Sequence, residues 1–265
     1  MSRPRLTSIV SVALALTLAT VEPGVSAQSR SRLVRIAAAS DLRFALDELT
    51  ARLRESQPDL DVRVTYGSSG TFVAQIVNGA PFDLFLSADL DYPRQLAARG
   101  LTVEGSEFTY GVGHLVVWVP AASPLDVEKV GMEALADPRV RHVAIANPAT
   151  APYGRAAEAA MRGLGIFDRV KDKVVLGENV AQTLQFVQSG SAEAGVVALS
   201  LALAPTARSA GRFWVVPLNA YPRMDQGGVI LRTAIDIDAA RQFRAFLIGG
   251  AARTILRQYG FSLAD

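Results

Sequence analysis

The sequence contains no cysteine among its 265 residues. This excludes disulfide bonds, zinc sites built from thiolates and a cysteine nucleophile. It also excludes a lipid-bearing cysteine at an export cleavage site. For a protein that leaves the cytoplasm, the lack of thiols is typical of the bacterial periplasm, where oxidation threatens them.

Histidine and clustered charge are also scarce. The two histidines, His114 and His142, each open an apolar stretch that is typical of a strand. A serine hydrolase needs a histidine base in a cleft, so these positions argue against that class. The net charge is only +2 and the basic residues are scattered, whereas nucleic-acid binding needs clustered Lys and Arg. We expect no nucleic-acid partner.

No His, Asp and Glu cluster has the spacing of metal ligands. Asp83, Asp89 and Asp91 are close in sequence, but the first precedes a predicted strand and the others follow it. We interpret them as cap and turn residues rather than as a cation site.

Long apolar runs are limited to the N-terminus. Arg3 and Arg5 precede the run IVSVALALTLAT, and Val25 to Ala27 form a small-x-small cleavage site. The run is too short to span a bilayer well. The pattern predicts a secretory signal peptide over residues 1–27 rather than an anchor helix, and a mature chain in the periplasm.

Strand and helix patterns alternate along the rest of the chain, which predicts α/β architecture with mostly parallel sheets flanked by helices. One helix is predicted over 41–55, because five apolar residues fall on one face at helical spacing: Leu42, Ala45, Leu46, Leu49 and Leu53. The predicted strands cover 33–40, 61–67, 83–88, 114–120, 142–148, 173–178, 194–200, 212–218 and 227–232. The other predicted helices cover 71–78, 153–165, 179–190 and 238–261, the last interrupted near Gly249. Two such α/β sets suggest two lobes.

Neutral polar residues stand where predicted strands meet predicted helices. The junctions hold Ser40 and Asp41, the GSSG stretch 67–70, Thr150 with Tyr153, and Asn179 with Val180. Ligands bind at such junctions in parallel α/β sheets, and a helix N-terminus holds an anion without a basic side chain. Because these positions include no Lys or Arg, they are consistent with a tetrahedral oxyanion held by neutral donors. Ordinary N-caps are the plain alternative at each.

The GSSG stretch fits none of the common serine or phosphate motifs. A nucleophile elbow needs glycine at the fifth position from Gly67, where Thr71 stands. A phosphate loop needs a Gly-Lys pair that the stretch lacks. The GVGHLV stretch at 111–116 lacks the third glycine of a dinucleotide fingerprint, so we interpret it as a turn.

Taken in order, five blocks resemble the molybdate-binding periplasmic proteins of ABC transporters, which are type II periplasmic binding proteins. The blocks are AAASDLRFALDEL, YGSSGTFVAQIVNGAPFDLFLSAD, NPATAPYGRAAEAAM, GENVAQTLQFVQSGSAEAGVVALS and a terminal YGF. The resemblance covers essentially the whole mature chain. It implies two lobes, 28–109 plus 221–265 and 110–220, which close over the anion and dock on an inner-membrane permease.

The resemblance also implies a ligand set. First-lobe contacts fall on Ser40, the backbone of Asp41 and Ser69, with Ser68 as a neighbour, and second-lobe contacts on Tyr153 and the backbone of Val180. One departure stands out: some family members carry a tyrosine where this chain has Ala198, and Tyr153 is the substitute. Tyr153 either donates to the ligand or only closes the cleft.

The implied function is capture of molybdate or tungstate by a monomer that is not an enzyme and needs no cofactor. Another tetrahedral oxyanion, such as sulfate or phosphate, is the alternative ligand. A porphobilinogen-polymerising enzyme on this fold would need a cysteine. The effector domain of a transcription regulator would carry a helix-turn-helix where the signal peptide stands.

Overall fold

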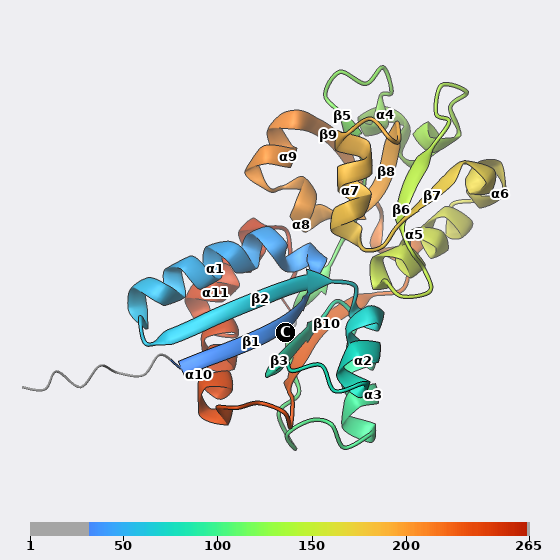
Figure 1. The fold of residues 1–265 in the computed structure, drawn as a ribbon. Helices are drawn as coiled ribbons and strands as arrows, with labels where there is room; N and C mark the ends of the chain where they lie inside the picture. The colour runs from blue at the N-terminus through green and yellow to red at the C-terminus, as the bar shows by residue number, and fades with distance from the viewer. Residues whose placement is uncertain (1–31, 264–265) are drawn as a thin grey trace, which may run out of the picture. The chain divides into compact units, whose positions relative to one another are not determined.

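A computed structural model describes residues 32–263 as two five-stranded sheets with helices packed on them (Figure 1). The predicted signal peptide over 1–27 lies outside the described residues. No helix between 32 and 263 is long and apolar enough to cross a membrane.

The first sheet has the strand order β2-β1-β3-β10-β4. Its strands are β1 (Arg32–Ala39), β2 (Leu60–Gly67), β3 (Leu84–Ser87), β4 (Phe108–Gly113) and β10 (Met224–Ile230). β1 pairs in parallel with β2 and β3, and β10 runs antiparallel to both β3 and β4. Four of the five strands therefore point the same way, and their carboxyl ends share one edge.

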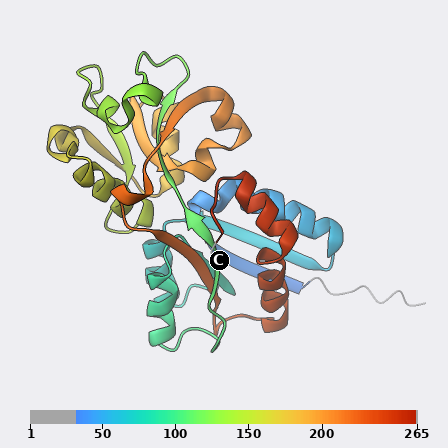
Figure 2. The same cartoon turned by 180° about the vertical axis from the view of Figure 1, so that it is seen from behind.

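Helices cover both faces of the first sheet, because successive side chains of its strands point to opposite sides. Ile36 and Leu84 pack with α1 (Arg43–Ser56), α10 (Ile237–Leu247) and α11 (Gly250–Gln258). Ala37 and Phe85 pack instead with α2 (Ser69–Val77) and α3 (Asp91–Ala98), which lie on the opposite face (Figure 2). The apolar face predicted for the helix over 41–55 is confirmed. Ala45, Leu46, Leu49 and Leu53 of α1 are buried, and so is Leu42 in the 3-10 turn before it.

The second sheet has the order β7-β6-β8-β5-β9, with β5 antiparallel to its neighbours β8 and β9. Its strands are β5 (Leu115–Pro120), β6 (Val143–Ala146), β7 (Val174–Gly177), β8 (Ala194–Ala198) and β9 (Gly211–Val215). The helices of this part are α4 (Val127–Val130), α5 (Pro152–Gly163), α6 (Phe167–Val170), α7 (Val180–Gln188), α8 (Leu199–Ala202) and α9 (Pro205–Ala210). Single 3-10 turns occur at η1 (Ser40–Leu42), η2 (Gly131–Ala136), η3 (Lys171–Lys173) and η4 (Leu218–Ala220). The predicted α/β class with mostly parallel sheets is confirmed.

We call each sheet with its helices a lobe. The chain passes from the first lobe to the second at His114, between β4 and β5, and returns between β9 and β10. The segment after α11 also joins this region, since Val112 and Ser262 exchange two backbone hydrogen bonds of 2.7 and 3.1 Å. The lobe boundaries proposed near Tyr110 and Tyr221 stay predictions.

Candidate functional site

One small cavity lies between the lobes, at the carboxyl ends of the strands. Its volume is about 10 Å³, which is about the space of one water molecule and far too small for a sugar, peptide or nucleotide. None of the described residues around it is Lys, Arg or His. They are Ala39, Ser40, Asp41, Gly67, Ser68, Ser69, Ala88, Ala151, Pro152, Tyr153, Asn179 and Val180. The structure thus brings together all five residues of the predicted ligand set, Ser40, Asp41, Ser69, Tyr153 and Val180.

Ser69 opens helix α2 and is fully buried. Its Oγ accepts a hydrogen bond of 3.1 Å from the backbone N–H of Ala88 at the end of β3. A hydroxyl that accepts in this way still has its own proton to donate. Ser68 is the N-cap residue, and its Oγ lies 2.7 Å from the Thr71 hydroxyl. The two serines of the GSSG stretch therefore have different partners.

Helix α7 points its N-terminus at the cavity from the second lobe. Its N-cap residue Asn179 accepts hydrogen bonds of 3.1 Å from the N–H groups of Ala181 and Gln182. The first N–H groups of a helix have no carbonyl within the helix to bond. The N–H of Val180, which the cap leaves unclaimed, is available to a ligand. Ser40 reaches across from the first lobe, and its Oγ accepts from the N–H of Ala181 at 3.4 Å.

Asp41 and Tyr153 meet across the lobes in a buried cluster with a third residue, Gln226. The Tyr153 hydroxyl donates to Asp41 Oδ2 at 3.1 Å, and Gln226 Nε2 donates to the same Oδ2 at 2.7 Å. Gln226 Nε2 also donates to the Tyr153 oxygen at 3.1 Å. A further bond between the lobes, 2.7 Å long, runs from the Ser200 hydroxyl to the Asp41 carbonyl.

Burial sets the protonation behaviour of this cluster. It raises the pKa of Asp41 to about 6, while the hydrogen bonds from Gln226 and Tyr153 pull the pKa down. Burial, and then the Asp41 charge, raises the pKa of Tyr153 well above its ordinary value, so its hydroxyl is neutral near pH 7. Ionised Asp41 is thus the charged group nearest a ligand in the cavity, and it would repel an anion.

At the rim of the cavity a backbone hydrogen bond and the side chain of Arg155 connect the two lobes. The N–H of Gly70 donates to the Thr150 carbonyl at 2.9 Å. Arg155 on α5 bonds Asp89 at 2.6 Å and the Tyr92 hydroxyl at 2.7 Å on the first lobe. These contacts describe a closed arrangement with the cavity behind them.

The arrangement suits an anion for two physical reasons. Four helical N-termini, those of η1, α2, α5 and α7, meet at the cavity, and each brings backbone N–H groups and partial positive charge toward it. Burial strengthens a hydrogen bond to a charged acceptor, because water no longer screens it. Among residues 32–263, no group of three or more His, Asp and Glu could hold a metal ion.

Sequence reasoning missed three contributors to this region. Gln226 lies on a strand whose pattern gives no hint of its buried partners, and Arg155 and Ser200 lie on helices where they look like surface or cap residues. Inspection of the junctions between predicted strands and helices could not find these three residues, because the role of each depends on a contact between the lobes.

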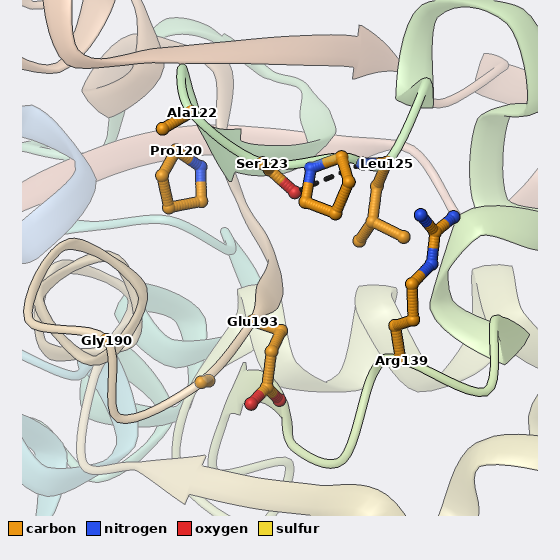
Figure 3. A pocket seen from close by; sticks show the side chains of 9 residues that line it. Pro120, Ala122, Ser123, Leu125, Arg139, Gly190 and Glu193 are labelled. Carbon is orange, nitrogen blue, oxygen red and sulfur yellow. Dashed lines mark hydrogen bonds between the residues drawn. The ribbon is translucent and has the colours of Figure 1, made fainter.

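A larger hollow elsewhere is less suited to an anion. The pocket in Figure 3, about 360 Å³ in volume, is lined mainly by apolar groups such as Pro120, Ala122 and Leu125. Its two charged residues are already engaged: Arg139 bonds Asp137, and Glu193 accepts from the backbone at 141 and 142. No set of free donors converges there.

Comparison with known proteins gives a consistent result. A family described as bacterial extracellular solute-binding protein matches residues 34–262. The molybdate-binding protein ModA of Rhodobacter capsulatus is 39% identical over 200 residues, 76% of this chain and 77% of that protein. The molybdate-binding protein ModA of Azotobacter vinelandii is 38% identical over 230 residues, 87% of this chain and 90% of that protein.

A solved structure agrees with the sequence relatives. The periplasmic molybdate-binding protein of Azotobacter vinelandii superposes with a TM-score of 0.82 at 34% identity. The match covers 88% of this chain and 100% of that chain. Fold and family are therefore supported by independent sequence and structure comparisons.

Proposed function

The chain belongs to the family of bacterial extracellular solute-binding proteins, and from that premise we propose that it captures molybdate and delivers it to an ABC permease. Proteins of this family bind a solute and do not transform it, so the chain is not an enzyme. The relatives described above are named for molybdate binding, which supports the choice of ligand.

A single observation carries the proposal: the cavity between the lobes is lined by neutral donors and helix N-termini, and among the described residues that line it Asp41 is the only charged one and none is basic. A tetrahedral dianion has four oxygens that accept hydrogen bonds in several directions. Each bond from a neutral donor to a charged oxygen contributes about 1.5–3 kcal/mol. A few such bonds in a water-excluded site suffice for tight binding.

We assign the donors as follows. The hydroxyls of Ser40 and Ser69 and the backbone N–H groups of Asp41 and Val180 bind the oxyanion, and Tyr153 closes the cavity over it. Ser69 supports this assignment best, because its oxygen is already held by Ala88 while its proton is free.

Size, and not charge, selects the ligand. Molybdate and tungstate have longer metal–oxygen bonds than sulfate has sulfur–oxygen bonds. A smaller ion leaves some buried donors without a partner, which costs affinity. The same argument does not separate molybdate from tungstate, so we propose that the protein binds both. Phosphate near pH 7 carries a proton and needs an acceptor as well as donors.

The cellular setting follows from the same family. We propose that the leader over 1–27 sends the protein to the periplasm, where the closed, loaded monomer docks on the permease. The two lobes then separate to release the anion. Rim contacts such as Gly70 to Thr150 form only when the lobes meet, so they couple loading to the closed form that the permease receives.

A calorimetric titration of the mature protein, residues 28–265, with four anions tests the function. Molybdate, tungstate, sulfate and phosphate are added separately at matched ionic strength. We expect saturable one-to-one binding of molybdate and tungstate and at least about a hundredfold weaker binding of sulfate and phosphate. Tight binding of sulfate or phosphate alone would move the ligand to the alternative, and no binding of any anion would reject the function.

A further inference from the structure

Gln226 is fully buried between the lobes, and the function proposed above gives it no role. Its side chain belongs to β10 of the first sheet, and its amide nitrogen bonds both Asp41 and Tyr153. Its Oε1 atom has no hydrogen-bond partner among the described residues. A buried amide with an unpaired oxygen destabilises the fold. The two hydrogen bonds that the Gln226 nitrogen donates must therefore offset that cost.

The local backbone is shaped to aim Gln226 at this cluster. The pairing of β10 with β4 shifts register between Gln226 and Gly227, which marks an irregularity of the bulge type. Bulges occur next to functional sites, where they redirect a side chain. On β4, Gly113, which pairs with Met224, has no room for a side chain, because a Cβ there would collide with Gln226 Nε2 and the Tyr153 hydroxyl.

The hydrogen-bond roles in the cluster are fixed by chemistry. An amide nitrogen only donates, so the Tyr153 oxygen must accept from Gln226 and its single proton goes to Asp41. The reverse orientation of the amide would set its carbonyl oxygen against the Asp41 carboxylate. With Asp41 ionised, Tyr153 therefore has no proton left for an anion in the cavity.

We propose that Gln226 is the positioning residue of the binding site: its amide holds the Asp41 carboxylate of the first lobe and the Tyr153 hydroxyl of the second lobe together. This inference rests on the proposed function of the cavity. According to it, the contact between Asp41 and Tyr153 depends on Gln226, which touches neither the cavity nor the ligand.

The cluster links anion binding to a proton. The groups that face Asp41 are neutral near pH 7: Tyr153 from α5, Gln226 from β10 and Tyr110 from β4, whose pKa burial raises well above its ordinary value. A bound dianion raises the pKa of Asp41 above the value of about 6 in the ligand-free cluster. Binding then takes up a proton, and affinity falls by up to about tenfold per unit as pH rises through and above about 6.

The test measures how Gln226 sets this pH dependence. Molybdate affinity of the mature protein is measured by calorimetry from about pH 5 to about pH 8, in two buffers of different ionisation enthalpy, to count protons taken up. Gln226→Met removes both donated bonds at similar length. Those bonds lower the pKa of Asp41, so their loss raises it. We therefore expect the pH at which affinity begins to fall to be about one unit higher in Gln226→Met. When Asp41 is replaced by Asn, which does not titrate, we expect molybdate affinity to be independent of pH. In that background Gln226→Met should no longer change the pH dependence.

Ser106→Ala is the matched control. It removes a buried hydroxyl of the same lobe that bonds the Val103 carbonyl at 2.6 Å and has no hydrogen bond to Asp41, Tyr153 or Gln226. Its pH profile should follow the unsubstituted protein. If Gln226→Met does not fold, Gln226→Glu replaces it, because two neighbouring carboxyls share a proton and shift the profile in the same direction.

Two results would overturn the proposal. One is a Gln226→Met profile that parallels the original at every pH, since a merely structural role lowers affinity uniformly. The other is an equal effect of Gln226→Met with Asp41 and with Asn at that position. If molybdate does not bind even the unsubstituted protein, the proposed function fails instead. The pH dependence of the ligand-free melting temperature then tests the cluster: Asp41 ionisation costs stability as pH rises through about 6, and Gln226→Met should shift that loss upward.

Discussion

Ser68 and Ser69 show how neighbouring residues of one type take different parts. Ser68 is the N-cap residue of α2, but its hydroxyl bonds the Thr71 hydroxyl and no backbone N–H of the helix. Ser69, one position later, uses its oxygen on Ala88 of β3, which leaves its proton free to donate. Only a position where two elements converge gives a hydroxyl both a fixed orientation and a free donor.

Ser69→Ala should weaken molybdate binding without unfolding the protein. The substitution removes one hydrogen bond to a charged oxygen, worth about 1.5–3 kcal/mol, or roughly 10- to 150-fold in the dissociation constant. Calorimetry on the mature protein measures the change. Ser106→Ala is the matched control: it removes a buried hydroxyl of the same lobe that bonds the Val103 carbonyl at 2.6 Å. A dissociation constant unchanged by Ser69→Ala would remove Ser69 from the site.

All five residues of the predicted ligand set stand at junctions between predicted strands and helices, where the chemistry of parallel sheets concentrates, and the resemblance implied their role as ligands. The Tyr153 hydroxyl has a defined partner in Asp41. Gln226 could not be predicted, because its role depends on a register shift and on a side chain from the other lobe. Neither feature leaves a periodic signal in a single sequence.

At the scale of elements, strong periodicity was enough. The helix over α1 was predicted because its apolar residues recur at helical spacing, and the strands β1, β2 and β6 because theirs alternate or form short continuous runs. β4 was not predicted, since its sequence FTYGVG carries two glycines. The helices α4, α6 and α8 have only four residues each, which is too short to display a helical period. α3 was also missed, although it has eight residues.

The N-terminus of α2 also controls how closely the lobes approach. A Cβ on Gly70 would lie 2.7 Å from the Thr150 carbonyl oxygen and 3.0 Å from the Tyr92 hydroxyl. The first of these neighbours is backbone of the other lobe, so it can give way only if the lobes part. Glycine at this position is therefore a requirement of closure and not of the helix.

Gly70→Ala should separate binding from stability. Within α2, alanine is a better helix former than glycine, so the melting temperature of the ligand-free protein should hold or rise. The clash on closure should cost about 1–3 kcal/mol of binding, or roughly five- to 150-fold in affinity. Thermal melting and calorimetry on the same sample measure both effects.

Gly250→Ala serves as the comparison, because Gly250 opens α11 and an added Cβ there meets nothing within 4 Å. It should leave affinity unchanged. Equal affinity of Gly70→Ala and Gly250→Ala would show that the contact of Gly70 with Thr150 does not form in the loaded protein.

At the scale of the whole molecule, the site exists only when both lobes contribute. Ser40, Asp41 and Ser69 come from the first lobe, and Tyr153, Asn179 and Val180 from the second. The α/β class of each lobe was predictable from alternating strand and helix patterns. The packing of one lobe on the other was not, because it depends on single contacts such as Arg155 with Asp89 and Gln226 with Tyr153.

The absence of a basic side chain around the cavity is what separates this account from a generic anion site. Arg155 lies two residues after Tyr153, but its guanidinium is bonded to Asp89 and Tyr92 at the rim. The account therefore requires that the bound ion meets hydroxyl and backbone N–H groups alone. Replacing Arg155 would then affect closure but not the donors themselves.

The most direct measurement is a crystal structure of the mature protein with tungstate, whose metal is located by anomalous scattering. The account predicts one strong peak between the lobes, with tungstate oxygens about 2.7–3.2 Å from Ser69 Oγ and from the backbone nitrogens of Asp41 and Val180. It also predicts that no guanidinium or ammonium group lies in contact with the ion. A peak outside this cavity, or one paired with Arg155, would contradict the central claim that neutral donors from both lobes hold the oxyanion.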